Sequence, residues 1–152
     1  MENIQTLEQA LDFAIEREKE AQAFYLEWAE KASDADMTQV LLEFAEQECQ
    51  HKEALEKVRK GNKALRFKED LFPSIHLVDF AVDARMGPDM TLEDALAVAM
   101  KREKVSYRLY LELAAAAESE ALVEILVSLA HEEANHRVRL EIEYDAVISE
   151  AT

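Results

Sequence analysis

Small and hydrophobic residues recur along the first third of the chain at alternating steps of four and three, the spacing of one buried face on a long helix. The first such run is Leu7, Leu11, Ala14, Glu18, Ala21, Tyr25, Trp28 and Ala32. After the polar stretch Ser33–Asp36 comes a second run, Met37, Leu41, Phe44, Glu48, His51, Leu55 and Val58. Thr6 stands where a helix cap is expected, and Gly61 where a helix ends. Residues 6–60 are therefore predicted to form a helical hairpin.

The same pattern returns near the end of the chain. One run is Leu92, Leu96, Ala99, Glu103, Ser106, Tyr110, Leu113 and Ala117, and the next is Leu122, Leu126, Leu129, Glu133, His136 and Leu140. A shift of 85 residues aligns the two halves without a gap, and about 18 of the 48 positions from 6 to 53 are identical to their partners. Thr91 matches Thr6 as a helix cap, and Glu118–Ser119 forms the turn. Residues 91–150 are thus a second copy of the hairpin.

Residues 61–90 connect the two hairpins and have apolar content of their own. The apolar residues are Phe72, Ile75, Leu77, Val78, Phe80, Val82 and Met86. Pro73 and Gly87–Pro88 bracket most of them, which favours a short helix packed on the bundle over a flexible linker. A connection of about thirty residues can also run the length of a helix of about 38 Å. We therefore expect a single domain, residues 1–152, that is an all-α four-helix bundle with one long crossover rather than an up-down-up-down chain.

Composition supports this fold and narrows the function. Among 152 residues there are only two Gly and two Pro, too few for the turns of a sandwich, barrel or α/β fold. The net charge of -16 disfavours binding to nucleic acid or anionic membranes and favours cations as partners. Cys49 is the single cysteine, so neither an intramolecular disulfide nor a cysteine metal site is expected. No signal-peptide pattern or membrane-spanning run is present, which predicts a soluble cytoplasmic protein.

Acidic residues and histidines interrupt the four buried faces only near their middles. They are Glu18, Glu48, His51, Glu103, Glu133 and His136. In each hairpin the midpoint between the two glutamates falls in the predicted turn, so the glutamates lie level in the bundle interior. Unpaired charges buried there would cost several kcal/mol each, and two divalent cations would neutralise four carboxylates. The alternative is that these residues lie on solvated helix faces of an acidic protein.

The ligand types narrow the choice of metal. Glutamate and histidine in Glu-x-x-His lie on one helix face, and this mixed set suits iron or manganese, although affinity alone does not exclude zinc or cobalt. The stretches Ala14–Tyr25, Phe44–His51 and Leu129–His136 resemble the rubrerythrin branch of the ferritin-like di-iron carboxylate proteins. The resemblance covers nearly the whole chain. It implies a ferritin-like bundle that holds two iron ions, in which Glu48 and Glu133 bridge the metals.

By the same resemblance the other four candidates would complete one metal each, in the pairs Glu18 with His51 and Glu103 with His136. Two departures from the family stand out. The two-domain rubrerythrins carry a four-cysteine rubredoxin domain, which one cysteine cannot supply, so electrons would come from a separate protein. Rubrerythrins also place an extra glutamate three residues after the third-helix ligand, where this chain has Ser106, and the symmetric site that results resembles that of bacterioferritin.

Further residues near the predicted site each have a functional and a purely structural interpretation. Tyr25 and Tyr110 share a face with Glu18 and Glu103 and could bond metal-bound carboxylates or supply electrons, or they could be ordinary core tyrosines. Gln47 and Glu132 precede the bridging glutamates and are candidate acceptors for the second ring nitrogen of a ligating histidine, or they are exposed. The small residues at positions 21 and 106, Ala21 and Ser106, would leave room for a diatomic molecule or peroxide, or would only permit close packing.

Three functions remain open at the level of sequence. The first is a rubrerythrin-like oxidoreductase, active in oxidative stress, that reduces hydrogen peroxide or dioxygen with electrons from an external donor such as a rubredoxin. The second is a ferroxidase for iron storage, which needs a closed cage and is less favoured because the fourth helix is expected to end near Ser149 with no fifth helix after it. The third is a non-catalytic metal-binding bundle. The resemblance also implies a homodimer.

Overall fold

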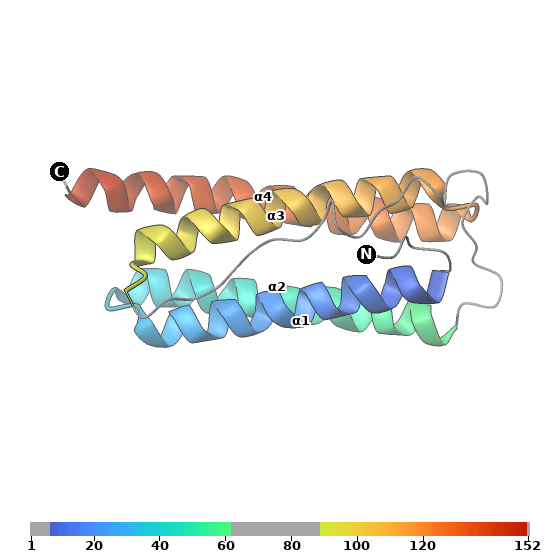
Figure 1. Ribbon diagram of the computed structural model, residues 1–152, viewed down its shortest axis with the longest axis horizontal. Helices are drawn as coiled ribbons and strands as arrows, with labels where there is room; N and C mark the ends of the chain where they lie inside the picture. The colour runs from blue at the N-terminus through green and yellow to red at the C-terminus, as the bar shows by residue number, and fades with distance from the viewer. Residues whose placement is uncertain (1–6, 62–88, 152) are drawn as a thin grey trace.

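Four long helices make up the described part of the molecule. The computed structural model describes residues 7–61 and 89–151. Its helices are α1 (Leu7–Lys31), α2 (Ala35–Lys60), α3 (Leu92–Ala116) and α4 (Glu120–Ala151). α1 packs on α2 and α3 on α4, and the two hairpins meet through contacts of α1 with α3 and of α2 with α4. Figure 1 shows α2 and α3 running in the same direction, so the chain passes between opposite ends of the bundle, which confirms the single long crossover.

Side-chain caps explain where two of the helices begin. Asp34 caps α2 by accepting a hydrogen bond from the Asp36 backbone N–H at 3.2 Å. The predicted turn at Ser33–Asp36 was therefore too long, because Ala35 and Asp36 already belong to the helix. At the start of α3, Thr91 accepts from the Asp94 backbone N–H and the Asp94 side chain accepts from the Thr91 N–H. This capping box confirms the predicted helix cap at Thr91.

Other predicted helix ends have mixed outcomes. Gly61 ends α2, its backbone N–H donating to the Lys57 carbonyl at 3.1 Å. α4 continues to Ala151, past the end expected near Ser149. The Thr6 cap and the short helix expected between Gly61 and Met90 lie outside the described residues. None of the helices in the described ranges is long and apolar enough to cross a membrane.

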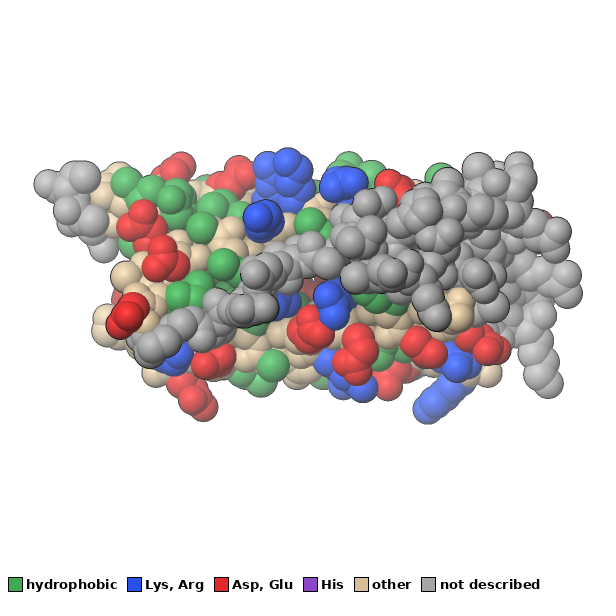
Figure 2. All heavy atoms as spheres, viewed as in Figure 1, with side chains coloured by type: hydrophobic (Ala, Val, Ile, Leu, Met, Phe, Trp, Pro, Cys, Tyr) green, Lys and Arg blue, Asp and Glu red, His purple; other side chains and the backbone are tan. Residues whose placement is uncertain are grey.

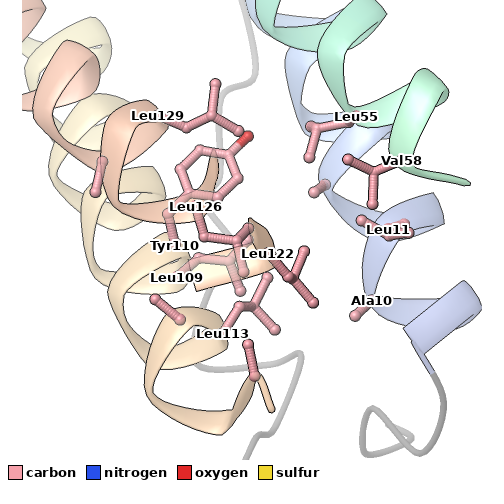
Figure 3. Close-up of a cluster of buried hydrophobic side chains, with 14 of the residues drawn as sticks. Ala10, Leu11, Leu55, Val58, Leu109, Tyr110, Leu113, Leu122, Leu126 and Leu129 are labelled. Atoms are coloured by element: carbon pink, nitrogen blue, oxygen red, sulfur yellow. The ribbon is translucent and has the colours of Figure 1, made fainter. Parts of the chain in front are cut away.

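The apolar interior consists of two clusters on either side of a polar layer. The first, drawn in Figure 3, brings together side chains from both hairpins, among them Leu11, Leu55, Leu109, Leu113, Leu122 and Leu126. The second lies toward the other end of the bundle and is richer in aromatic residues, with Phe24, Trp28, Met37, Leu41, Phe44, Leu96 and Leu140. Acidic and basic side chains are interspersed over the described part of the face in Figure 2. The two clusters fix the four helices on both sides of the site.

Candidate metal centre

The six candidate ligands form the buried polar layer between the two apolar clusters. All are between 1% and 5% exposed: Glu18, Glu48, His51, Glu103, Glu133 and His136. α1 and α3 contribute one glutamate each, while α2 and α4 contribute a glutamate and a histidine three residues apart on one helix face. The two copies of the sequence repeat therefore place matching sets of candidate ligands around one point in the bundle, in an approximately two-fold arrangement. The alternative of solvated helix faces is wrong for these residues.

Their polar atoms fall into two overlapping groups. Glu18, Glu48, His51 and Glu133 each offer one atom within 4.8 Å of the others, and so do Glu48, Glu103, Glu133 and His136. Glu48 and Glu133 belong to both groups, which is the placement expected of bridging carboxylates. The Nδ1 atom of His51 lies 2.8 Å from Oε1 of Glu133, and the Nδ1 atom of His136 lies 3.0 Å from Oε1 of Glu48. Each histidine thus faces the glutamate of the opposite hairpin.

Two buried tyrosines connect the halves of this layer. The Tyr25 hydroxyl donates a hydrogen bond to Oε1 of Glu103 at 2.5 Å, and the Tyr110 hydroxyl donates to Oε1 of Glu18. The repeat placed each tyrosine on the face of its own glutamate, but the hydroxyl of each reaches the glutamate of the other hairpin. Burial, and then the charge of the bonded glutamate, raise the pKa of both tyrosines well above the usual value. Both therefore remain protonated donors.

The outer ring nitrogens of the histidines have different partners. The Nε2 atom of His51 lies 2.6 Å from Oε2 of Glu132, whereas the Nε2 atom of His136 bonds to Oε1 of Gln47. Both partners come from the helix across the bundle, and both side chains are exposed, Glu132 at 54%. Outer contacts of this kind set the tautomer and orientation of a ligating histidine and leave Nδ1 to face the metal. The two halves of the site differ in these contacts, because the partner of one histidine is a carboxylate and the partner of the other is an amide.

Without metal, protons offset part of the negative charge in this layer. Burial would lower the pKa of His51, but hydrogen bonds and charge attraction from Glu18 and Glu48 outweigh it and raise that pKa to about 11. The same balance, with Glu103 and Glu48 as the neighbours, raises the pKa of His136 to about 9. Burial and the charge of Glu48 raise the pKa of Glu18 well above its usual value. A metal ion bound here must displace protons from the histidines.

Two oxygen atoms show that the residues fit metal ions. Oε2 of Glu18 and Oε2 of Glu103 are buried and have no hydrogen-bond partner within residues 7–61 and 89–151. Each lies 3.6 Å from the Nδ1 atom of the histidine in its own group, His51 and His136 respectively. Burial of an unpaired carboxylate oxygen is costly, and a cation between that oxygen and the imidazole removes the cost. Four carboxylates with two imidazoles are a suitable donor set for a pair of divalent ions of the iron or manganese type.

A small cavity lies beside this layer, between α1 and α3. Its volume is about 20 Å³, above the roughly 10–15 Å³ that a single water molecule needs, so only a very small molecule fits. The predicted small residues Ala21 and Ser106 line it, together with Glu103 and Glu133. Arg17 and Arg102 line it as well, although sequence reasoning gave them no role. The signal was present, because these arginines are identical in the repeat and directly precede Glu18 and Glu103.

Fold and site together place the chain in the ferritin-like class of four-helix bundles that carry a carboxylate and histidine metal site. The family model of rubrerythrin matches residues 9–144. The chain belongs to the rubrerythrin family. A solved structure of a Thermotoga maritima protein, described as a ferritin-like diiron-carboxylate protein, is similar with a TM-score of 0.79 and 23% identity, over 95% of this chain and 98% of that one. The comparison with curated proteins gives no match.

Proposed function

We propose that this protein is a di-iron oxidoreductase that reduces hydrogen peroxide or dioxygen with electrons from a separate donor protein. The observation that carries the proposal is the pair of overlapping ligand groups, buried and joined through Glu48 and Glu133. Membership of the rubrerythrin family supports it. The donor is proposed to be a rubredoxin-like protein, and the working form a homodimer in the cytoplasm.

The proposed ligands divide into shared and terminal ones. Glu48 and Glu133 would bridge two iron ions, and the other four residues would complete one ion each, Glu18 with His51 and Glu103 with His136. A pair of iron ions supplies two electrons by cycling between the ferrous and ferric states, which balances the reduction of one hydrogen peroxide and two protons to two water molecules. The apolar clusters on both sides exclude bulk water from the layer.

The tyrosines hold the terminal glutamates in place for this role. With Oε1 of Glu18 accepting from Tyr110 and Oε1 of Glu103 accepting from Tyr25, only Oε2 of each glutamate is left to face a metal. Glu132 and Gln47 hold the imidazole rings in the same way, through Nε2. The cavity lined by Ala21 and Ser106 would admit an oxidant of two or three heavy atoms from the α1 and α3 side.

Stopped-flow oxidation of the ferrous-loaded protein tests the proposal. We expect hydrogen peroxide to oxidise the iron faster than dioxygen does at equal concentration, because that order distinguishes a peroxidase from an oxidase or ferroxidase. The Glu18→Ala variant should lose rapid oxidation, with its metal content measured alongside. Equal rates with the two oxidants would eliminate the peroxidase version. A variant that oxidises iron as fast as the wild type with a full metal load would eliminate the role of these ligands.

A ferroxidase of the storage type is a second candidate, favoured by one observation. Ser106 takes the place of an additional carboxylate, so the proposed ligand set is the symmetric one of six residues. Iron storage requires a closed cage, which size-exclusion chromatography detects directly. A mass near that of a dimer is the expected result, and a mass of about 24 protomers would favour storage instead.

A further inference from the structure

Two arginines line the cavity beside the metal layer, and each lies against an aromatic ring. Arg17 from α1 and Arg102 from α3 occupy equivalent positions in the repeat and line the same cavity as Glu103 and Glu133. The guanidinium carbon of Arg17 lies 5.0 Å from the centre of the Phe13 ring, and that of Arg102 lies 5.3 Å from the centre of the Phe24 ring. These cation–π contacts hold both guanidinium groups over aromatic rings at the cavity wall.

The Nε atoms of both arginines are buried donors without acceptors. Neither Arg17 Nε nor Arg102 Nε has a hydrogen-bond partner in the described residues. The outer part of Arg17 is fixed by Glu20, whose Oε1 lies 2.7 Å from Arg17 Nη2. An arginine does not lose its proton in a protein, so the cavity wall holds two positive charges with unsatisfied donors.

We propose that this cavity is a binding site for a small monoanion of two or three heavy atoms, held between Arg17, Arg102 and the Ser106 hydroxyl next to the metal pair. The volume of about 20 Å³ limits the ligand to a very small one. The two guanidinium groups set its charge, since a buried cation with an unpaired donor is stabilised by an anion.

Anion binding in this cavity is expected to be stronger when the neighbouring layer holds metal. Glu103 and Glu133 also line the cavity, and in the metal-free state their carboxylate oxygens would repel an anion. Two divalent cations neutralise four carboxylates, and the two arginines, of which Arg17 is paired with Glu20, then leave the cavity with a net positive charge.

This inference deepens the proposed function, because the hydroperoxide anion belongs to the same class of ligand, but it requires no redox chemistry. Azide is a suitable probe, and the zinc-loaded protein is a suitable host because zinc does not change oxidation state. Binding is followed by the shift of the azide infrared band during titration. We expect azide to bind the zinc-loaded wild-type protein more tightly than the metal-free protein.

Substitutions on the cavity wall test whether azide binding depends on the arginines or on the metal alone. Loss of one charged hydrogen-bond donor is expected to weaken azide binding by about tenfold or more, in Arg17→Gln and in Arg102→Gln. Arg102→Lys keeps the charge but lacks Nε, so it should fall between Arg102→Gln and the wild type. Ser106→Val fills the cavity without a change in charge and should also weaken binding. Arg139→Gln removes an exposed partner of Glu143 and should leave binding unchanged.

Zinc content and circular dichroism of each variant show whether the bundle and its metal layer are intact. The inference is overturned when the zinc-loaded wild type gives no shifted azide band, or when an intact Arg17→Gln/Arg102→Gln double variant binds azide as tightly as the wild type. Arginine-dependent azide binding without peroxide reduction by the iron-loaded protein would leave this inference standing and remove the proposed function. Peroxide reduction with arginine-independent azide binding would do the reverse.

Discussion

At the scale of single residues, the two halves of the site differ most at the outer nitrogens of the histidines. His51 bonds to the carboxylate of Glu132, while His136 bonds to the amide of Gln47 and stacks on Phe44 with 4.5 Å between ring centres. A carboxylate partner increases the basicity of a histidine more than an amide does. The metal position beside His51 is therefore expected to bind a divalent cation more tightly than the position beside His136.

Substitution of Glu132 tests this difference between the two metal positions. Glu132→Gln keeps an acceptor for His51 Nε2 but removes the charge, which should weaken binding at that position by about tenfold. Calorimetric titration with zinc should show two unequal binding steps in the wild type and nearly equal steps in the variant. Glu124→Gln, an exposed change on the same helix, is the matched control. Identical titrations for wild type and Glu132→Gln would show that Glu132 does not influence the metal.

Titration of the histidines gives the metal-free protein a pH-dependent stability. The folded-state pKa is about 11 for His51 and about 9 for His136, both above the usual value of 6.5. A raised pKa means that the folded state binds the proton more tightly, so this stability is fully present below pH 6.5 and is lost as pH rises through the folded pKa. The raised pKa of Glu18 acts in the same direction. The free energy of unfolding of the metal-free protein should therefore fall between pH 6.5 and 9.

Urea denaturation of metal-free protein at pH 6, 7.5 and 9 measures this change. The His51→Gln/His136→Gln double variant should show a much smaller loss over the same interval, because both titrating groups are gone. In the zinc-loaded protein the trend should reverse, since zinc competes with protons for the histidines and binds better as pH rises. A metal-free wild type that becomes more stable toward pH 9 would contradict the raised pKa values.

At the scale of helices, a side-chain cap stabilises one helix end and can be removed without a change in the metal site. Thr91 and Asp94 form a capping box at the start of α3, nine residues or more before Glu103. Thr91→Ala should lower the free energy of unfolding by about 1 kcal/mol, and Thr91→Ser should restore most of it. Denaturant unfolding measures both, with zinc stoichiometry as the control for the site. A Thr91→Ala protein as stable as the wild type would show that this cap does not contribute.

The register of the helices could be predicted from sequence, whereas contacts between hairpins could not. The apolar spacing, with Glu18 and Glu48 equidistant from a turn, was sufficient to predict that these glutamates lie level. A hairpin with a short turn has little freedom to slide. The repeat could not show that Tyr110 bonds to Glu18 rather than to Glu103, since both are on the same face of the bundle interior. Nor could it show that Arg17 lines a shared cavity, because that depends on how α1 packs on α3.

At the scale of the whole molecule, a charged layer separates two apolar clusters, so metal content should control stability. Glu18, Glu48, Glu103 and Glu133 are nearly inaccessible to water, and without metal the raised pKa values of Glu18 and of the two histidines let protons offset part of the buried negative charge. A bound cation at a hundredfold excess over its Kd should add about 2.7 kcal/mol of stability per site. Thermal unfolding with and without a chelator measures this effect. A Tm that the chelator leaves unchanged would count against a metal site.

The central claim is that six buried residues bind two metal ions, and iron analysis tests it most directly. Protein loaded with ferrous iron under anaerobic conditions, freed of excess iron and measured for iron per chain, should contain two iron ions. Glu48→Ala removes a carboxylate shared by both ligand groups and should leave at most one. A wild-type protein that retains one iron or none, or a Glu48→Ala variant that retains two, would contradict the account.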